Sequence, residues 1–446
     1  MKKSFKSAAT LLLLSTVLAA CGTNSGTGNT GNTGTAGNAS PASTASSEKV
    51  KLTAWAWNVN VGALNEAVTS YQKDHPNVEL EVQDIGRLDV YDKLSTGLAA
   101  GGAGLPDIVL VEDDRLQGYL DAFPKGFVNL SEKGFDEKLS EFPTFKQELT
   151  KKDGASYAFP FDAGPTGIFY RTDLFEKAGV DASKIETWDD YLAAGKLIKE
   201  KTGAQLFPVD KFKDDATLRI MLNEQGAFYF DKDGNIDFNN PKYVKALETL
   251  KQFDDAGLIK DVNGWDGTVS ATVDGSIASI AFGAWYTGTI SDQAKDLSGK
   301  WGVFQVPAFE KGGNRAANLG GSSWALTSTS KNVDAAYSFM EYFSLTPDVQ
   351  KVAMEKYGLF PSLTSVYNED VFTTGVEFFS NQNIWMLFAQ EMNSVPTPYY
   401  TKDYSVALDE SVKAQSDVFN GKAPADALKE AAARLKDRTS REVNGG

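Results

Sequence analysis

The sequence predicts an α/β fold whose core is an open β-sheet flanked by helices. Apolar and polar residues alternate at 50–56 and again at 78–82, as expected for strands. Between these two segments, Leu64, Ala67 and Tyr71 fall on one face of a helix. A strand, a helix and a second strand at this spacing form a βαβ unit, which pairs its strands in parallel through a right-handed crossover.

A wholly apolar run supports the same fold class. Residues 108–111 are Ile, Val, Leu and Val in succession, which is typical of a strand buried on both faces. A helical stretch around Tyr91, Leu94 and Leu98 precedes this run and ends at two glycines. The first part of the chain is therefore predicted to be an open α/β sheet.

Two later helices have clear boundary signals. Thr187 and Asp190 form a capping box for a helix that ends near Gly203. Asn240 is followed by proline, which favours a helix start, and Gly257 is the expected stop. The α/β character therefore continues through the second part of the chain.

An export signal is predicted at the start of the chain, over residues 1–20. Lys2, Lys3 and Lys6 precede an apolar run, which small residues then join to Cys21. The apolar run is shorter than the roughly 20 residues that a membrane-spanning helix needs. The ending Leu-Ala-Ala-Cys resembles the lipobox of bacterial lipoproteins, and this resemblance implies cleavage before Cys21 and a diacylglyceryl group on its sulfur. The alternative is an ordinary signal with a chance cysteine.

The segment that follows, 22–47, is predicted to be a disordered tether. It consists of Gly, Thr, Asn, Ser, Ala and one Pro and has no charge, so it cannot bury a core. As a flexible coil it would span on the order of 25–30 Å. Two acyl chains give stable anchoring, so residues 21–47 would hold the protein at a membrane, on its extracellular side.

Composition narrows the function further. The chain has 44 basic and 59 acidic residues, and 41 basic residues would remain after cleavage, for a net charge of −18. Such an acidic body argues against nucleic acid as a partner. One cysteine and one histidine exclude disulfides and multi-histidine metal sites, so we expect no metal and no cofactor. About 400 residues remain after the tether, which is large for one core and suggests two domains.

Open sheets bind ligands at the carboxyl ends of their strands, and this rule selects candidate residues. The strand at 50–56 leads into Trp57 and Asn58, and the buried strand leads into Glu112, Asp114 and Arg115. Aromatic faces pack on the C–H faces of sugars, while carboxylates, amides and Arg bind hydroxyls. Aromatic residues in other turns could complete such a site, among them Phe161 with Asp162, Trp265, Trp285, Trp324 and Tyr399.

The carboxylates also allow a second hypothesis, that of a secreted carbohydrate-active hydrolase. Glu112 with Asp114, or Glu112 with Asp162, could act as the acid and base of a glycosidase. That chemistry needs defined separations between the two carboxyl groups, which a sequence does not give. Alternatively, these carboxylates bind hydroxyls or solvate a loop.

The chain resembles the extracellular solute-binding proteins of ABC importers, in the family that includes maltose-binding protein. The similarity covers essentially the whole mature body, and it lies in the order and spacing of several short motifs. These are KLTAWAW at 51–57, LPDIV at 105–109, YAFP at 157–160, IFYRTDLF at 168–175, DGS at 274–276, GAW at 283–285, GGSSWAL at 320–326 and the helix start at 421–427.

The resemblance implies two α/β lobes joined by hinges, with the ligand in the cleft between them. The first lobe would be 48–162 and 319–366, and the second would be 163–318 and 367–446. Transferred position by position, the resemblance adds ligand-binding candidates to those at the strand ends and in the aromatic turns. The full set is Trp57, Asn58, Glu112, Asp114, Arg115, Asp162, Asp210, Lys211, Trp265, Trp285, Gly321, Ser322, Phe360 and Tyr399, with no catalytic residue.

The function that the resemblance implies is the capture of a sugar or oligosaccharide for a membrane permease. The expected partners are the sugar, the ABC transporter permease subunits and the membrane that holds the lipid anchor. The protein is expected to be a monomer and not an enzyme. The style of the tether favours a Gram-positive cell.

Overall fold

The computed structural model describes residues 49–445. The predicted signal peptide, Cys21 and the tether lie outside the described residues. The predicted βαβ unit is confirmed: β1 (Val50–Ala56), α1 (Val59–Tyr71) and β2 (Val78–Asp84) follow one another, and β1 pairs with β2 in parallel along all seven residues. Each apolar side chain predicted on the inner face of the helix is buried.

The predicted apolar strand is also confirmed. β3 (Ile108–Glu112) pairs in parallel with β1 on the side opposite β2, and its first four residues are buried. The helix before it, α2 (Arg87–Ala99), buries Tyr91, Leu94 and Leu98 as expected. β1, β2 and β3 therefore end at one edge, where the residues that follow them come together.

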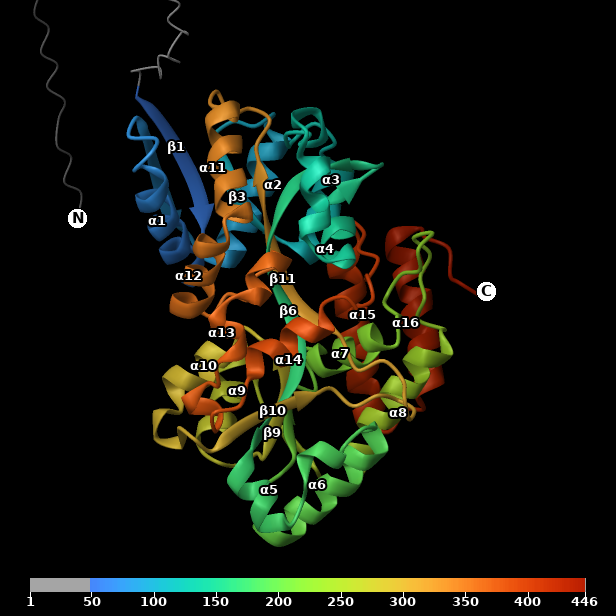
Figure 1. Ribbon diagram of the computed structural model, residues 1–446. Coiled ribbons are helices and arrows are strands. Elements are labelled where there is room, and N and C mark those ends of the chain that lie inside the picture. The colour runs from blue at the N-terminus through green and yellow to red at the C-terminus, as the bar shows by residue number, and fades with distance from the viewer. Residues whose placement is uncertain (1–48, 446) are drawn as a thin grey trace, which may run out of the picture. The chain divides into compact units, whose positions relative to one another are not determined.

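The rest of the sheet is antiparallel and depends on one long strand. β6 (Ala158–Arg171) pairs along its first half with β11 (Asn318–Leu326), which also pairs with β3. Along its second half β6 lies between β9 (Ser279–Gly283) and β10 (Trp301–Gln305). Figure 1 shows β6 and β11 side by side between β1 and β3 on one hand and β9 and β10 on the other. The sheet is thus mixed, and only its first three strands are parallel.

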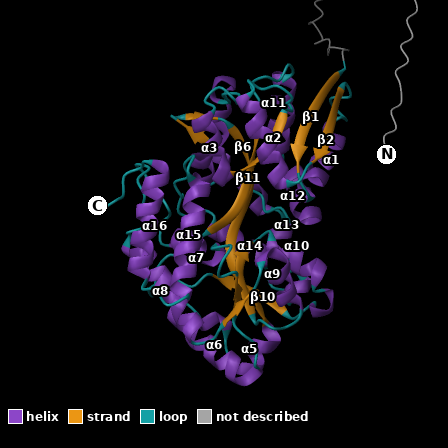
Figure 2. Cartoon of the chain, turned by 180° about the vertical axis from the view of Figure 1, so that it is seen from behind, coloured by secondary structure: helices purple, strands orange, loops and turns teal. Residues whose placement is uncertain are grey.

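Helices and short strands complete the fold on both sides of this sheet (Figure 2). Among residues 49–445, none of the helices combines the length and the apolar character that a bilayer crossing demands. The remaining elements are α3 (Asp113–Ala122), α4 (Thr144–Leu149), β4 (Lys151–Lys152), β5 (Ala155–Ser156), α5 (Thr172–Ala178), α6 (Trp188–Thr202), β7 (Phe207–Val209), α7 (Ala216–Glu224), α8 (Pro241–Asp255), β8 (Ile259–Asp261), α9 (Gly264–Val273), α10 (Tyr286–Gln293), α11 (Val333–Leu345), α12 (Pro347–Tyr357), α13 (Asp370–Thr373), α14 (Ile384–Glu391), α15 (Tyr404–Phe419) and α16 (Pro424–Thr439).

The predicted helix boundaries are confirmed where the sequence carries capping signals. Thr187 and Asp190 form the reciprocal capping box at the start of α6, and Gly203 ends that helix with φ of 80°. The side chain of Asn240 accepts a hydrogen bond from the backbone of Lys242 at the start of α8. Such caps use local hydrogen bonds alone, which explains why they can be predicted from sequence.

Two large hydrophobic clusters lie on opposite faces of the second half of β6. Phe169 belongs to one cluster and its neighbour Ile168 to the other, because successive side chains of a strand point to opposite faces. On β10, Val303 and Phe304 divide between the clusters in the same way. Helices on both sides are thus held to one shared strand. The boundaries expected for the two lobes stay a prediction.

Candidate functional site

A cluster of charged residues lies where β3 ends and α3 begins. Glu112, the last residue of β3, accepts hydrogen bonds from two residues of α2. The Arg87 guanidinium lies 3.0 Å from Oε2 of Glu112, and the Tyr91 hydroxyl lies 2.5 Å from the same oxygen. The carboxylate of Glu112 is therefore oriented by the neighbouring helix rather than free in solvent.

Asp114 and Arg115 occupy the first turn of α3. The Arg115 guanidinium lies 5.4 Å from the ring centre of Tyr91 and 5.4 Å from that of Tyr404 in α15, so it is placed between two aromatic rings. It also contacts the hydroxyl of Ser405. Burial raises the pKa of Asp114 to about 6, and the nearby charge of Glu112 adds to this effect. Asp114 therefore has a pKa well above the usual range of an aspartate.

Asp162 lies in β6 opposite Ser322 of β11. One of its carboxylate oxygens accepts hydrogen bonds from the backbone N–H of Ser322 at 2.8 Å and from its hydroxyl at 2.6 Å. Burial raises the pKa of Asp162 to about 6, although the positive charge of Lys146 opposes the shift. Asp162 is 6% exposed, and its Oδ1 is held by Ser322 at the point where β6 and β11 pair.

The family resemblance implies that Gly321 and Ser322 form a turn before a strand, but both residues lie inside β11. Gly321 has φ of 99°, in a region that favours glycine. A methyl group there would lie 2.9 Å from Oδ2 of Asp113 and 3.1 Å from the carbonyl oxygen of Asp162. The absence of a side chain at Gly321 therefore allows the two strands and the start of α3 to approach closely.

A cavity of about 1100 Å³ is lined mainly by residues of α9, α10 and α12 and of the start of α1. Asn58 lies on one side, at the start of α1, with φ of 50° and an exposed side chain. Trp265 in α9 and Trp285 before α10 lie on another side, with ring centres 6.0 Å apart. Trp265 is 48% exposed, so its face is open to a ligand. Three of the predicted residues, far apart in sequence, thus line one cavity.

The charged residues that line this cavity are mainly acidic. Asp266, Asp274, Asp292 and Glu355 contribute carboxylates. Lys356 is the one basic residue among the lining residues, and its ammonium already lies 2.8 Å from the carboxylate of Glu66. The cavity therefore offers aromatic faces and hydrogen-bond acceptors, but its described residues provide no unpaired cation for an anionic solute.

The cavity and the charged cluster are joined through β11. The indole N–H of Trp285 donates a hydrogen bond of 2.8 Å to the carbonyl oxygen of Leu319. Leu319 is only two residues before Gly321, which touches Asp113 and Asp162. Gly164 and Gly283 allow this approach, because a methyl group at either position would collide with Leu319. Aromatic and carboxylate groups are thus brought to one region.

Two of the sequence-predicted residues, Trp57 and Phe360, do not line the cavity. Trp57 is 6% exposed and packs edge-on against Tyr91, with ring centres 6.0 Å apart. Phe360 is fully buried among the rings of Tyr367 and Phe388. Both residues are therefore packed in the interior, and neither lines the cavity.

The remaining three candidates also lie outside the cavity lining. Asp210 follows β7 and accepts a hydrogen bond of 2.7 Å from the backbone N–H of Gly264, the first residue of α9, so it supports the helix that carries Trp265. Lys211 forms an ion pair of 2.6 Å with Asp254 in α8. Tyr399 is 42% exposed in a loop.

Three residues of the site were missed by the sequence reasoning, namely Asp113, Lys146 and Tyr404. Asp113 is 2% exposed and lies 2.5 Å from the ammonium of the fully buried Lys146. Tyr404 comes from α15, far along the chain, and reaches Arg115. No local signal marks Lys146 or Tyr404, since both act through contacts between distant segments. Asp113 lies between Glu112 and Asp114, two of the predicted residues.

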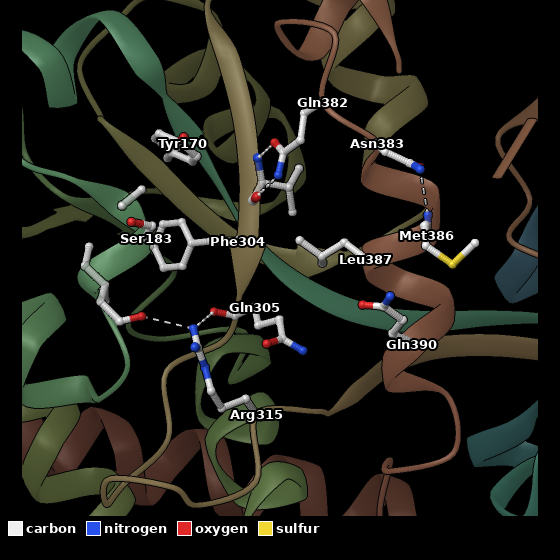
Figure 3. A pocket seen from close by; sticks show the side chains of 13 residues that line it. Tyr170, Ser183, Phe304, Gln305, Arg315, Gln382, Asn383, Met386, Leu387 and Gln390 are labelled. Atoms are coloured by element: carbon white, nitrogen blue, oxygen red, sulfur yellow. Dashed lines mark hydrogen bonds between the residues drawn. The ribbon is translucent and has the colours of Figure 1, made fainter. Parts of the chain in front are cut away.

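A smaller cavity of about 440 Å³ lies between β10 and α14 and contains none of the predicted residues. Figure 3 shows Leu387 and Gln390 on the side of α14 that faces Phe304 of β10. The Gln382 amide already bonds both the N–H and the carbonyl of Val303, and so it closes the outer edge of the strand. The Gln382 amide is therefore already bonded to the protein at this cavity.

Within residues 49–445, no three His, Cys, Asp or Glu side chains are grouped as a metal ion requires. The acidic cluster at the start of α3 is instead neutralised by Arg and Lys side chains. The charged groups of the site thus fit direct hydrogen bonding to a solute.

Comparison with known proteins supports the interpretation of this site as a solute-binding site. The model of the bacterial extracellular solute-binding protein family matches residues 66–380. The chain is 35% identical over 358 residues to the lactose-binding protein of Rhizobium radiobacter, covering 78% of this chain and 84% of that protein. It is 28% identical to the arabinooligosaccharide-binding protein of Bacillus subtilis (strain 168), covering 96% and 98%.

The fold is supported by a solved structure. A crystal structure of an extracellular solute-binding protein of family 1 is 25% identical, has a TM-score of 0.75 and covers 87% of this chain and 99% of its own. The predicted two-lobed α/β fold class is thereby confirmed. The family and these relatives are binding proteins and not enzymes, so the comparisons give the hydrolase hypothesis no support. The chain belongs to the bacterial extracellular solute-binding proteins.

Proposed function

We propose that this chain is the substrate-binding subunit of an ABC importer and that it captures a neutral sugar or oligosaccharide. The main observation for this proposal is the role of β11. This strand contacts Trp285, the neighbour of Trp265, through Leu319, and it contacts the carboxylate of Asp162 through Ser322. Sugar rings present apolar C–H faces and hydroxyls together, and this site offers a partner for each. The sugar-binding relatives support the same class of solute.

The size and charge of the cavity refine this proposal. A volume of about 1100 Å³ suits a solute of two or more sugar units rather than a single ring. Four carboxylates in the lining disfavour a phosphate ester or an acidic sugar, because like charges repel in a partly desolvated site. A neutral oligosaccharide is not repelled by these carboxylates.

Capture would involve closure of the two lobes over the sugar, with the strands near Asp162 and Ser322 as the connection between them. The lobes would then be 48–162 with 319–366, and 163–318 with 367–446. The closed form would dock on the permease subunits, and one copy of the chain would act alone. Tyr399, which is exposed outside the cavity, would reach the sugar only after such a movement.

Cys21 is the proposed site of lipid attachment, in a cell with one membrane. Cleavage before Cys21 would leave residues 21–47 as the tether, and a diacyl group would give stable anchoring to the outer face. A flexible tether keeps the receptor near its permease while leaving the lobes free to move.

The first test is isothermal titration calorimetry with a panel of neutral mono- and oligosaccharides. We expect binding heat from at least one disaccharide or longer saccharide, and none from glycerol phosphate. Binding of a phosphate ester with no response to any sugar would overturn the proposal.

Trp265→Ala should weaken sugar affinity by about tenfold or more, since one aromatic platform is lost. Because Trp265 is 48% exposed, the substitution leaves no buried void, and the free energy of unfolding should change by less than about 1 kcal/mol. Phe212→Ala is the matched control, since Phe212 is 50% exposed but does not line the cavity. Equal affinity in both variants would argue against the cavity as the sugar site.

Affinity should depend on pH through Asp114 and Asp162, whose pKa values are both raised to about 6. Above this pH the carboxylates are ionised and accept strong hydrogen bonds from hydroxyls, and below it they are protonated. The dissociation constant should therefore rise by about tenfold as the pH falls from about 7.5 to about 5. Asp114→Asn should weaken binding at neutral pH and flatten the profile.

The exposed Asp334 serves as the control for this pH dependence. It lies in an ion pair with Lys133 at the start of α11, and that pairing lowers its pKa. Asp334→Asn should therefore leave the profile of affinity against pH unchanged. A dissociation constant for the unmodified protein that stays constant over this pH range would contradict the assigned role of the two carboxylates.

Cells that express the full chain should incorporate labelled palmitate into it, and the protein should sediment with membranes. The Cys21→Ser variant should take up no label and should appear in the culture medium. Retention of the label by this variant would show that the lipid is attached elsewhere.

A further inference from the structure

Lys146 in α4 is fully buried and yet uses all three of its ammonium hydrogens. Its Nζ lies 2.5 Å from Oδ2 of Asp113, 2.8 Å from the carbonyl oxygen of Asp162 and 3.0 Å from the carbonyl oxygen of Ser322. Its side chain has no exposed surface. Burying a lysine is costly unless it is fully paired, and here the pairing is complete.

The three partners come from three different segments. Asp113 begins α3, Asp162 lies in β6 and Ser322 lies in β11. The other oxygen of Asp113 accepts a hydrogen bond of 2.7 Å from the hydroxyl of Ser323, so α3 and β11 are joined twice. One ammonium group therefore fixes the start of α3 against both long strands.

This contact lies where the backbone pairing of β6 and β11 is irregular. The register shifts between Asn318 and Gly321 and again between Ser322 and Ser323. Residues on either side of such shifts lose part of the regular ladder of hydrogen bonds. Lys146 supplies side-chain hydrogen bonds to both strands at this point, and these bonds replace part of what the ladder lacks.

The same contact lies next to the proposed ligand groups. Glu112 precedes Asp113, and Asp114 and Arg115 follow it, so the anchoring of Asp113 sets the direction in which these side chains leave the sheet. Asp162 holds Ser322 through its carboxylate while its carbonyl binds Lys146. A shift of the ammonium would therefore move both the acidic cluster and the strand that carries Leu319, to which Trp285 is bonded.

A buried ion pair is a weak source of stability, because desolvation offsets much of the attraction between the charges. Two apolar side chains of similar volume would hold α4 against the sheet about as well. They would not bond two strand carbonyls and a carboxylate at the same time. The chemistry of Lys146 thus fits a role in geometry more closely than a role in stability.

We propose that Lys146 is a positioning residue for ligand binding: it ties the first turn of α3 to β6 and β11 and so holds the acidic cluster in register with the tryptophans. This inference rests on the proposed function for its effect on affinity. The tie itself does not depend on the identity of the ligand.

Lys146→Met removes the ammonium and keeps the length of the side chain. In the full chain, its dissociation constant for the saccharide found by calorimetry should rise by about tenfold or more. Lys138→Met is the matched control. Lys138 is close to Lys146 in sequence, but it is partly exposed and its ammonium bonds Glu341 of α11 rather than β6 or β11. The dissociation constant of this control should stay within about twofold of that of the unmodified protein. Unchanged affinity in Lys146→Met would overturn the proposal.

A double variant separates positioning from stability. Lys146→Met leaves Asp113 buried and unpaired, so its melting temperature should fall. The double variant Lys146→Met/Asp113→Leu removes that charge and should regain most of the lost stability. Its affinity should stay low, because the carbonyls of Asp162 and Ser322 still lack their shared donor. Recovery of affinity together with stability would show that Lys146 only neutralises Asp113, and the positioning role would be wrong.

Hydrogen exchange of the ligand-free protein tests the tie independently of any sugar. Lys146→Met should increase exchange at the amides of β11 and of the first turn of α3, relative to Lys138→Met. If the unmodified protein binds no saccharide, the proposed function is wrong. The exchange measurement would still test whether Lys146 holds α3 and β11 in place. Unchanged protection at both segments would show that it does not.

Discussion

β6 is one strand of 14 residues that belongs to both parts of the sheet. Its first half pairs with β11 and its second half with β9 and β10, and all but one of its residues are buried. A strand paired on both sides cannot shift by one residue without turning every buried side chain to the other face. The relative placement of the groups on β3, β11 and the turn before α10 is therefore set by the register of this strand.

Glycines and serines, rather than large side chains, occupy the middle of this arrangement. Gly164, Gly283 and Gly321 allow backbone, indole and carboxylate to approach where any methyl group would collide. Asp162 and Ser322 then pair across the two strands. Close packing at this point leaves the polar groups with fixed partners, so a ligand meets an arrangement that exists before it binds. Such preorganisation reduces the cost of ordering the site on binding.

The sequence predicted the local features of this fold well and its long-range contacts poorly. The βαβ unit, the buried strand and the capped helices follow from periodicity and capping, which involve neighbours in the chain. The order of β6, β9, β10 and β11 could not be predicted, because it depends on antiparallel pairing between segments more than 100 residues apart, such as Phe159 with Trp324. Trp324, a possible ligand platform by sequence, is fully buried against Phe343.

The site was predictable to the same extent. The strand-end rule gave Glu112, Asp114 and Arg115, and resemblance to the family added Gly321 and Ser322. Lys146 could not be found, because a lysine in a short helix gives no sign in sequence that it is buried. Phe360, in turn, has the residue type of a sugar platform but lies in an aromatic core. A phenylalanine in a sequence could belong to a sugar site or to a hydrophobic core, since both use aromatic rings.

The pairing of the cations explains the kind of solute that the site fits. Arg87 is held by Glu112, Lys146 by Asp113, Arg219 by Asp215 and Lys356 by Glu66. Arg115 also lies 3.5 Å from the carboxylate of Asp114. Each of these five cations therefore already has a carboxylate of the protein as its partner. An anionic solute would have to displace one of these pairs and leave a carboxylate without its partner, which is costly when the carboxylate is buried. A neutral solute needs no such exchange and can bind the remaining carboxylate oxygens through its hydroxyls.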